Sequence, residues 1–198
     1  MQIRVTLVSP GPIPSSLVSL VPSGETTRSE EPFGTRISVL TSHDDPAHLR
    51  DALRAVAGPV AVGVVAGPLA TTPARLLMMD VDSTLTTTEA VDLLAAHAGV
   101  GERVAEITER AMRGELDFEA SLRERVATLR GLPTSVFDEV GPAMTLSPGA
   151  RELIAAARAA GARVGVTSGG FTQLVAPLAA RLGPGFFNAN QLETPRPR

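Results

Sequence analysis

The stretch Leu76-Leu77-Met78-Met79-Asp80-Val81-Asp82-Ser83-Thr84-Leu85-Thr86 decides the fold. Its first four residues form a short apolar run that ends at Asp80, which is typical of a buried parallel strand. Ligands of open α/β sheets bind outside the carboxyl ends of such strands. We therefore expect Asp80 and Asp82 to line a crevice, where one carboxylate can attack an electrophile while the other transfers protons.

The same two carboxylates are candidate ligands for a metal ion. A hard cation such as Mg²⁺ takes oxygen ligands readily and would offset the repulsion between Asp80 and Asp82. The alternative is a solvated turn, because Asp and Ser are both common in turns. On the residues of this motif alone, both interpretations stay open.

A second polar cluster, Ser168-Gly169-Gly170-Phe171, follows a predicted strand over Arg163–Thr167. We expect this cluster to open a helix, where backbone N–H groups and the Ser168 hydroxyl would form an anion site. The glycines would let an anion approach the backbone closely. The alternative is that Ser168 is the N-cap of that helix and that the glycines form the turn.

The second half of the chain alternates between strand and helix patterns. Helical patterns extend over about 86–145 and are divided at 99–101, at Gly114 and at 131–133. A helix over about 148–160, the strand 163–167, a helix over 171–182 and a strand over 186–189 follow. This order predicts an α/β domain over 73–198, in which a parallel sheet carries an inserted helical cap.

The first 72 residues predict a separate small α+β domain. Residues 10–35 are rich in Pro, Gly, Ser, Thr and Glu, so we expect a flexible linker there. A strand over 36–41, a helix beginning at Asp45-Pro46 and a strand over 59–66 follow. This order resembles half of a ferredoxin-like regulatory module of the ACT type.

Composition and charge exclude several classes of protein. The net charge is −3, with 18 basic and 21 acidic residues, which argues against a general binder of nucleic acid or of anionic membranes. The chain has no cysteine and no lysine, so a thiolate metal site and a catalytic lysine are excluded. Its apolar runs are too short for a signal peptide or a membrane helix. We expect a soluble, cytoplasmic protein.

Together and in this order, the two polar clusters resemble the haloacid dehalogenase superfamily of phosphohydrolases. Three segments make the resemblance more specific: DVDSTLTTTEAVDLLAAHAG at 80–99, AMRGELDFEASLRERVATLRGLP at 111–133 and TSGGFTQ at 167–173. These segments are similar to the phosphoserine phosphatases of that superfamily. The resemblance covers roughly residues 75–192, and it implies a Rossmann-like sheet with an inserted cap.

The resemblance also implies chemical roles for the residues of both clusters. Asp80 would be the nucleophile that forms an aspartyl-phosphate intermediate, and Asp82 would be the general acid and then the general base. Mg²⁺ would be held by Asp80, by the backbone carbonyl of Asp82 and by an aspartate of a later motif. Ser168 and Gly169 would hold the phosphoryl oxygens.

A predicted helix over 117–130 places Phe118, Leu122, Arg125 and Leu129 on one face. Arg125 is thus a cation on an apolar stripe, where it needs a carboxylate partner. The resemblance implies that this partner is the carboxylate of the substrate. The alternative is that the Arg125 side chain extends along the apolar surface to reach solvent.

Three other cap residues have both a functional and a structural interpretation. Glu89 stands three residues after Thr86, which matches a capping box, whereas the resemblance makes Glu89 the partner of the substrate ammonium group. Met112 and Phe118 match apolar cap positions that shield the site. Their alternative role is core packing within the cap.

Part of the family pattern is missing from this sequence. The family has a basic residue after the third strand and then a Gly-Asp-Gly-x-x-Asp-type motif, and neither is present before the sequence stops at Arg198. Arg196 and Arg198 do not match the basic motif. We interpret the sequence as a fragment. The magnesium site would then lack a ligand, and the strand before Asp80 would be an exposed sheet edge that invites aggregation.

The leading hypothesis is a phosphoserine phosphatase that completes serine biosynthesis. One alternative is a phosphatase of the same superfamily for another small phosphomonoester. Another is a non-catalytic amino-acid-binding remnant. The sequence leaves the oligomeric state open, with a homodimer of the full-length parent as one option.

Because two motifs are missing, we predict that these 198 residues alone have little or no hydrolase activity. Phosphate release from O-phospho-L-serine in excess Mg²⁺ measures this activity directly. Turnover of about 1 per second or above, which is an ordinary enzyme rate, would contradict the prediction.

Overall fold

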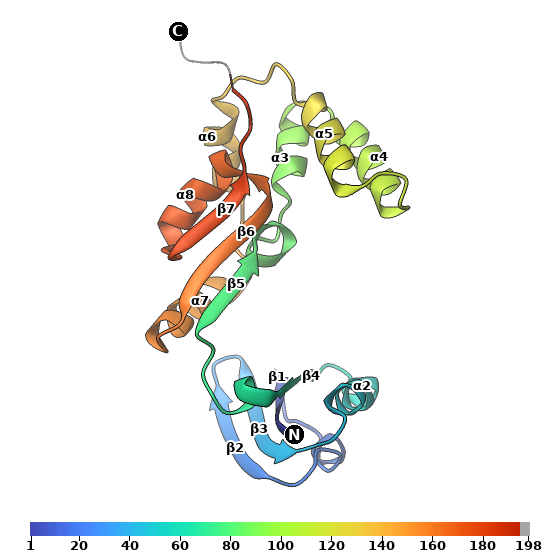
Figure 1. Ribbon diagram of the computed structural model, residues 1–198, viewed down its shortest axis with the longest axis vertical. Helices are drawn as coiled ribbons and strands as arrows, with labels where there is room; N and C mark the ends of the chain where they lie inside the picture. Colours follow the sequence, from blue (N-terminus) through green and yellow to red (C-terminus); the bar gives the residue numbers. More distant parts are fainter. Residues whose placement is uncertain (195–198) are drawn as a thin grey trace. The chain divides into compact units, whose positions relative to one another are not determined.

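A computed structural model describes residues 1–194 of the chain (Figure 1). The chain forms two compact units, one over Met1–Ala74 and one that begins at Arg75, close to the predicted boundary between residues 72 and 73. Arg196 and Arg198, considered above for the basic motif, lie outside the described residues. No helix within residues 1–194 is both long enough and apolar enough to cross a membrane.

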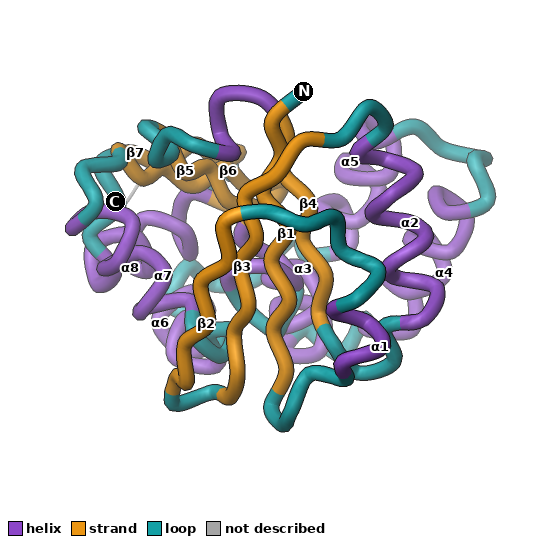
Figure 2. The backbone as a smooth tube through the Cα atoms, turned by 90° about the horizontal axis from the view of Figure 1, so that it is seen from below, coloured by secondary structure: helices purple, strands orange, loops and turns teal. Residues whose placement is uncertain are grey.

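The first unit is a four-stranded antiparallel sheet with strand order β2-β3-β1-β4 (Figure 2). This order, with a helix after β1 and another after β3, is that of a ferredoxin-like fold. The sequence pattern predicted half of this arrangement and missed β1, while the resemblance to ACT-type regulatory modules stays a prediction. The elements are β1 (Gln2–Ser9), α1 (Ser15–Val18), β2 (Glu25–Glu31), β3 (Gly34–Ser42), α2 (Pro46–Val56), β4 (Ala61–Ala66) and the 3-10 helix η1 (Gly67–Ala70).

Residues 10–35 are not a flexible linker, because they contain α1 and all of β2. β2 pairs with β3 from Glu25 opposite Leu40 to Glu31 opposite Gly34. It is an edge strand without a buried residue, so it lacks the apolar alternation by which strands are recognised. The turn into β3 requires glycine at position 34, where φ is +126°.

The core of the first unit lies on one face of its sheet. Ile3, Val5 and Leu7 alternate along β1 and are completely buried. They share a hydrophobic cluster with Leu17 of α1 and Leu53 of α2. Two helices therefore cover this face and bury its alternate residues.

The second unit is an α/β domain with a parallel sheet of order β5-β6-β7 and an insertion of helices between β5 and β6. This confirms the predicted fold class. The elements are β5 (Leu76–Asp80), the turn η2 (Val81–Leu85), α3 (Ala90–His97), α4 (Gly101–Met112), α5 (Phe118–Thr128), α6 (Val136–Val140), the 3-10 helix η3 (Gly141–Ala143), α7 (Ala150–Ala159), β6 (Arg163–Phe171), α8 (Thr172–Leu182) and β7 (Phe186–Asn190).

β6 is longer than the sequence predicted, and this changes the interpretation of the second polar cluster. Ser168, Gly169 and Gly170 lie inside the strand, and α8 begins only at Thr172 with Phe171 at its N-cap. The pairing register with β7 shifts between Thr167 and Phe171, so the backbone bulges there. The predicted helix N-terminus at this cluster and the alternative N-cap role of Ser168 are both wrong.

β5 ends at Asp80 and lies at an edge of the sheet that the described residues form. Asp80 is next to Thr167 of β6 in the parallel register. Leu77 and Met79 pack against the core of the unit, whereas Leu76 and Met78 on the other face are exposed. The sheet therefore carries both polar clusters to the same end of β5 and β6.

Candidate active site

The turn that follows β5 has buried residues at both ends and polar residues between them. Val81 and Leu85 are buried in the core, and Thr86 is completely buried. The Thr86 Oγ1 lies 3.0 Å from the carbonyl oxygens of Val81 and Thr88. Between these anchors, Ser83 adopts a left-handed conformation with φ of 53°, which is strained for a residue with a side chain. Strain of this kind is common at functional sites.

A cavity of about 320 Å³ opens at the ends of β5 and β6, between the sheet and the cap helices. The sheet side supplies two carboxylates and glycine backbone, and the cap side supplies a carboxylate, a guanidinium and apolar side chains. The lining residues are Asp80, Asp82, Glu89, Val91, Phe118, Leu122, Arg125, Gly169, Gly170 and Phe171.

Hydrogen bonds fix both oxygens of the Asp82 carboxylate. The backbone N–H of Ala90 donates to Oδ1 at 2.7 Å, and the Ser168 hydroxyl donates to Oδ2 at 2.9 Å. Ala90 is the first residue of α3, so Asp82 caps the first cap helix. Among residues 1–194, no group hydrogen-bonds the Asp80 carboxylate in this structure. Asp82 is therefore oriented by its neighbours, while the Asp80 carboxylate lines the cavity without such a constraint.

Glu89 does not form the capping box that its spacing from Thr86 suggested. Its Oε1 accepts a hydrogen bond of 2.6 Å from the Ser83 hydroxyl, and the backbone N–H of Thr86 donates to the Val81 carbonyl. The cap of α3 comes instead from Asp82, which the three-residue spacing rule cannot find. Glu89 is thereby held at the cavity wall, where it can meet a cation.

Ser168 is buried and reaches the cavity through Asp82. Its Oγ accepts a hydrogen bond of 2.8 Å from the backbone N–H of Gly170 while it donates to Asp82. A Cβ on Gly170 would lie 2.9 Å from the Asp82 Oδ2 and 3.0 Å from the Ser168 Oγ. Gly170 was not among the predicted site residues, although its place in the Gly-Gly pair was a usable signal.

The cap helix α5 presents Phe118, Leu122 and Arg125, which the sequence pattern placed on one face, to the cavity. Arg125 is partly buried, and its Nε lies 3.4 Å from the Ser121 carbonyl of the same helix, so both interpretations of this residue stay open. A Cβ on Gly169 would lie only 3.1 Å from the Phe118 ring. The Phe118 side chain therefore stands over the glycine backbone of the sheet.

Ser168 reaches the cavity only through Asp82, and Met112 is placed elsewhere altogether. It is the last residue of α4, its side chain is 85% exposed, and it lines a different cavity, with Asp92 and Thr108. Both the expected contact with the site and the alternative role in core packing of the cap fail for this position. The helical periodicity of the sequence could not show that α4 ends at Met112 and leaves its side chain exposed.

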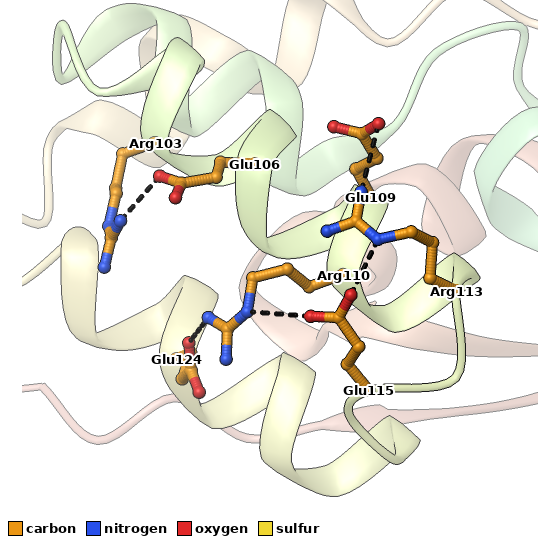
Figure 3. Close-up of polar contacts among 7 residues, drawn as sticks. All are labelled: Arg103, Glu106, Glu109, Arg110, Arg113, Glu115 and Glu124. Atoms are coloured by element: carbon orange, nitrogen blue, oxygen red, sulfur yellow. Dashed lines mark hydrogen bonds and ion pairs between the residues drawn. The ribbon is translucent and has the colours of Figure 1, made fainter.

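A network of ion pairs connects α4 with α5 (Figure 3). The Arg110 guanidinium lies 2.8 Å from a Glu124 carboxylate oxygen and 3.7 Å from one of Glu115. Arg113 pairs with Glu115 at 2.7 Å and with Glu109 at 3.1 Å, and its hydrogen bond lowers the pKa of Glu115. Exposed pairs contribute at most about 1 kcal/mol each. Of these pairs, the one between Arg110 and Glu124 joins α4 directly to α5, the helix that carries Arg125.

A family model of haloacid dehalogenase-like hydrolases matches residues 77–192. The chain belongs to this family. The match spans the sheet, the cap helices and both polar clusters described above, and it confirms the resemblance found in the sequence.

Known relatives show more specifically which members of the haloacid dehalogenase-like family this chain is similar to. It is 49% identical over 161 residues to a phosphoserine phosphatase of Streptomyces coelicolor, and the aligned region covers 80% of this chain and 39% of that protein. It is 54% identical over 118 residues to a phosphoserine phosphatase of Streptococcus thermophilus, with 60% of this chain and 55% of that protein aligned.

The comparison with solved structures also finds similarity to a phosphoserine phosphatase. A structure described as a phospho-aspartyl intermediate analogue of phosphoserine phosphatase matches with a TM-score of 0.59 and 38% identity. This match covers 63% of the present chain and 60% of the other. The haloacid dehalogenase-like chain thus spans between two fifths and three fifths of the proteins it is compared with here.

The two glycines of the bulge predict different costs of substitution. Gly170→Ala places a methyl group against the fixed Asp82 carboxylate, and we expect it to lower the free energy of unfolding by about 2 kcal/mol through strain and a broken hydrogen bond. Gly169→Ala meets only the exposed Phe118 ring, which can move, so we expect less than about 1 kcal/mol. Amide hydrogen exchange in β6 measures both, and equal losses would contradict the geometry.

Proposed function

We propose that the protein hydrolyses O-phospho-L-serine to L-serine and phosphate, which is the last step of serine biosynthesis. The observation that carries the proposal is the content of one cavity. It holds two carboxylates suited to phosphoryl transfer together with Glu89 and Arg125, which are complementary to the ammonium and carboxylate groups of an amino acid. The relatives named phosphoserine phosphatase support the same substrate.

In the first step, an oxygen of Asp80 attacks phosphorus and the bond between phosphorus and the serine oxygen breaks. Asp82 gives its proton to the departing serine oxygen. The similarity to a solved phosphoserine phosphatase that holds an analogue of a phospho-aspartyl intermediate supports this covalent step. The hydrogen bonds from Ala90 and Ser168 leave each Asp82 oxygen one further lone pair for the proton in transfer.

In the second step, Asp82 takes a proton from a water molecule that attacks the phosphorus atom. The bond between phosphorus and Asp80 breaks, so that phosphate leaves and both carboxyl groups return to their starting states. Ser168 and Gly169 were both expected to hold the phosphoryl oxygens, but the Ser168 hydroxyl donates its proton to Asp82, so the backbone of Gly169 at the cavity wall is the group that takes this role. Phe118 and Leu122 reduce the access of bulk water, which strengthens the interactions with the charges inside the cavity.

The donor atoms at this site fit a hard divalent cation, and we propose Mg²⁺. The Asp80 carboxylate, which accepts no hydrogen bond within residues 1–194, and the Asp82 backbone carbonyl are the groups that would hold it. The described part of the chain contains no cluster of three or more metal-binding side chains. When bound, Mg²⁺ would neutralise charge on the transferring phosphoryl group. A cytoplasmic location and a homodimer stay predictions.

The role of Asp80 is tested by the substitution Asp80→Asn in the full-length protein. An amide cannot form the acyl phosphate, so we expect phosphate release from O-phospho-L-serine to fall by at least about a thousandfold and the beryllofluoride adduct to disappear. Asp92→Asn, which changes an exposed cap residue outside the site cavity, is the matched control. An Asp80→Asn variant as fast as its parent would end the proposal.

The roles of Glu89 and Arg125 are tested by changing the substrate as well as the protein. We expect Arg125→Lys to lower kcat/KM for O-phospho-L-serine by about 10- to 100-fold and to leave phosphoethanolamine, which lacks the carboxylate, nearly unchanged. Glu89→Gln should lower kcat/KM for O-phospho-L-serine and for phosphoethanolamine, which both carry an ammonium group. It should leave kcat/KM for 3-phosphoglycerate, which has no ammonium group, nearly unchanged. Arg123→Lys, on the exposed face of α5, is the control. Uniform losses on all three substrates would refute these roles.

A further inference from the structure

Asn190, the last residue of β7, contacts the site from outside the cavity wall. Its Nδ2 donates a hydrogen bond of 2.9 Å to the carbonyl oxygen of Gly169. Asn190 is not one of the cavity residues, and it lies outside the motifs considered above. Its contact nevertheless reaches the peptide group that joins the two glycines of the bulge.

This peptide group is held at both ends. Its oxygen accepts from Asn190, and its N–H, which belongs to Gly170, donates to the Ser168 Oγ at 2.8 Å. The Ser168 hydroxyl in turn donates to the Asp82 Oδ2 at 2.9 Å. Three consecutive hydrogen bonds therefore lead from the end of β7 to the Asp82 carboxylate. Hydrogen bonds aligned in this way strengthen one another.

The bulge explains why such a contact is needed. Regular pairing with β7 is interrupted between Thr167 and Phe171, so the ladder does not fix the glycine peptide. Two adjacent glycines can also rotate a peptide group at little steric cost. If the 169–170 peptide rotated, its N–H would leave Ser168, and the hydroxyl would be free to turn away from Asp82. The Asn190 side chain selects the orientation in which this does not happen.

We propose that Asn190 is a positioning residue for the acid and base step, because it locks the glycine peptide that aims the Ser168 hydroxyl at Asp82. The catalytic part of this role rests on the proposed function. Asn190 itself touches neither substrate nor the reacting atoms. It acts through Ser168, and this makes its effect separable from that of a residue that only stabilises the fold.

The first test compares Asn190→Asp with Asn188→Asp in the same strand. Asp has no N–H to donate and would face the Gly169 carbonyl with an oxygen, whereas the exposed Asn188 side chain makes no hydrogen bond within residues 1–194. We expect amide exchange at Gly170 to become about tenfold faster in Asn190→Asp and to stay within twofold in Asn188→Asp. Asn190→Ala, which removes the donor without adding charge, should give the same result if Asn190→Asp folds poorly.

The second test measures kinetics on O-phospho-L-serine. We expect Asn190→Asp to lower kcat by about tenfold with KM within about twofold, since part of the 10²–10⁴-fold contribution of a positioned acid and base is lost. In a Ser168→Ala background the same change should cost less than about twofold, because the contact no longer leads to Asp82. Additive losses would mean that Asn190 acts only on stability and would overturn the proposal.

The two tests separate this inference from the proposed function. An unchanged Gly170 exchange rate in Asn190→Asp overturns the inference, and so does faster exchange with unchanged kcat. If the full-length protein, which is used for the kinetic test, releases no phosphate from O-phospho-L-serine, the proposed function fails and the catalytic role of Asn190 fails with it. The exchange rates would still show whether Asn190 holds the glycine peptide.

Discussion

The fixation of the Asp82 carboxylate between Ala90 and Ser168 is the interaction on which the rest of the second unit depends. It joins the turn after β5, the first turn of the cap and the bulge in β6 through one charged group. Because each of its two oxygens accepts a hydrogen bond from a different element, the Asp82 side chain has a single orientation. The side chain that caps a helix is also the one placed to move a proton, and this ties the start of the cap to the chemistry of the sheet.

The cavity places four charged groups where their roles can differ. Within residues 1–194 the Asp80 carboxylate accepts no hydrogen bond and that of Asp82 accepts two, so two carboxylates of the same type have different environments. Glu89 and Arg125 come from the cap, and their opposite charges match the two charged groups of an amino acid. The cap therefore contributes recognition and the sheet contributes reactivity, with the Phe118 ring standing over the glycines between them.

Much of this arrangement was predictable from local patterns, and the failures have physical causes. An apolar run that ends at Asp80 and the helical spacing that places Phe118 and Arg125 on one face are short-range signals, so the sheet and the cap followed from them, whereas the roles of most site residues came from the family resemblance. The extension of β6 through Ser168 depends on pairing with a distant strand, and a Gly-Gly pair suggests a turn as readily as a bulge. The exposed strand β2 buries no residue, and the Asn190 contact joins residues 21 positions apart. Such features arise from tertiary structure, which periodicity does not encode.

The shared guanidinium of Arg110 gives the cap a property that the sheet end does not have. Its ion pairs with Glu115 and Glu124 are partly exposed, and dissolved ions screen charges in such positions over a Debye length of about 8 Å at physiological ionic strength. The contacts of Asp82 with Ala90 and with the buried Ser168 are shielded from that screening to a greater extent. Added salt should therefore weaken the ion pair between α4 and α5, while the Asp82 carboxylate keeps its geometry.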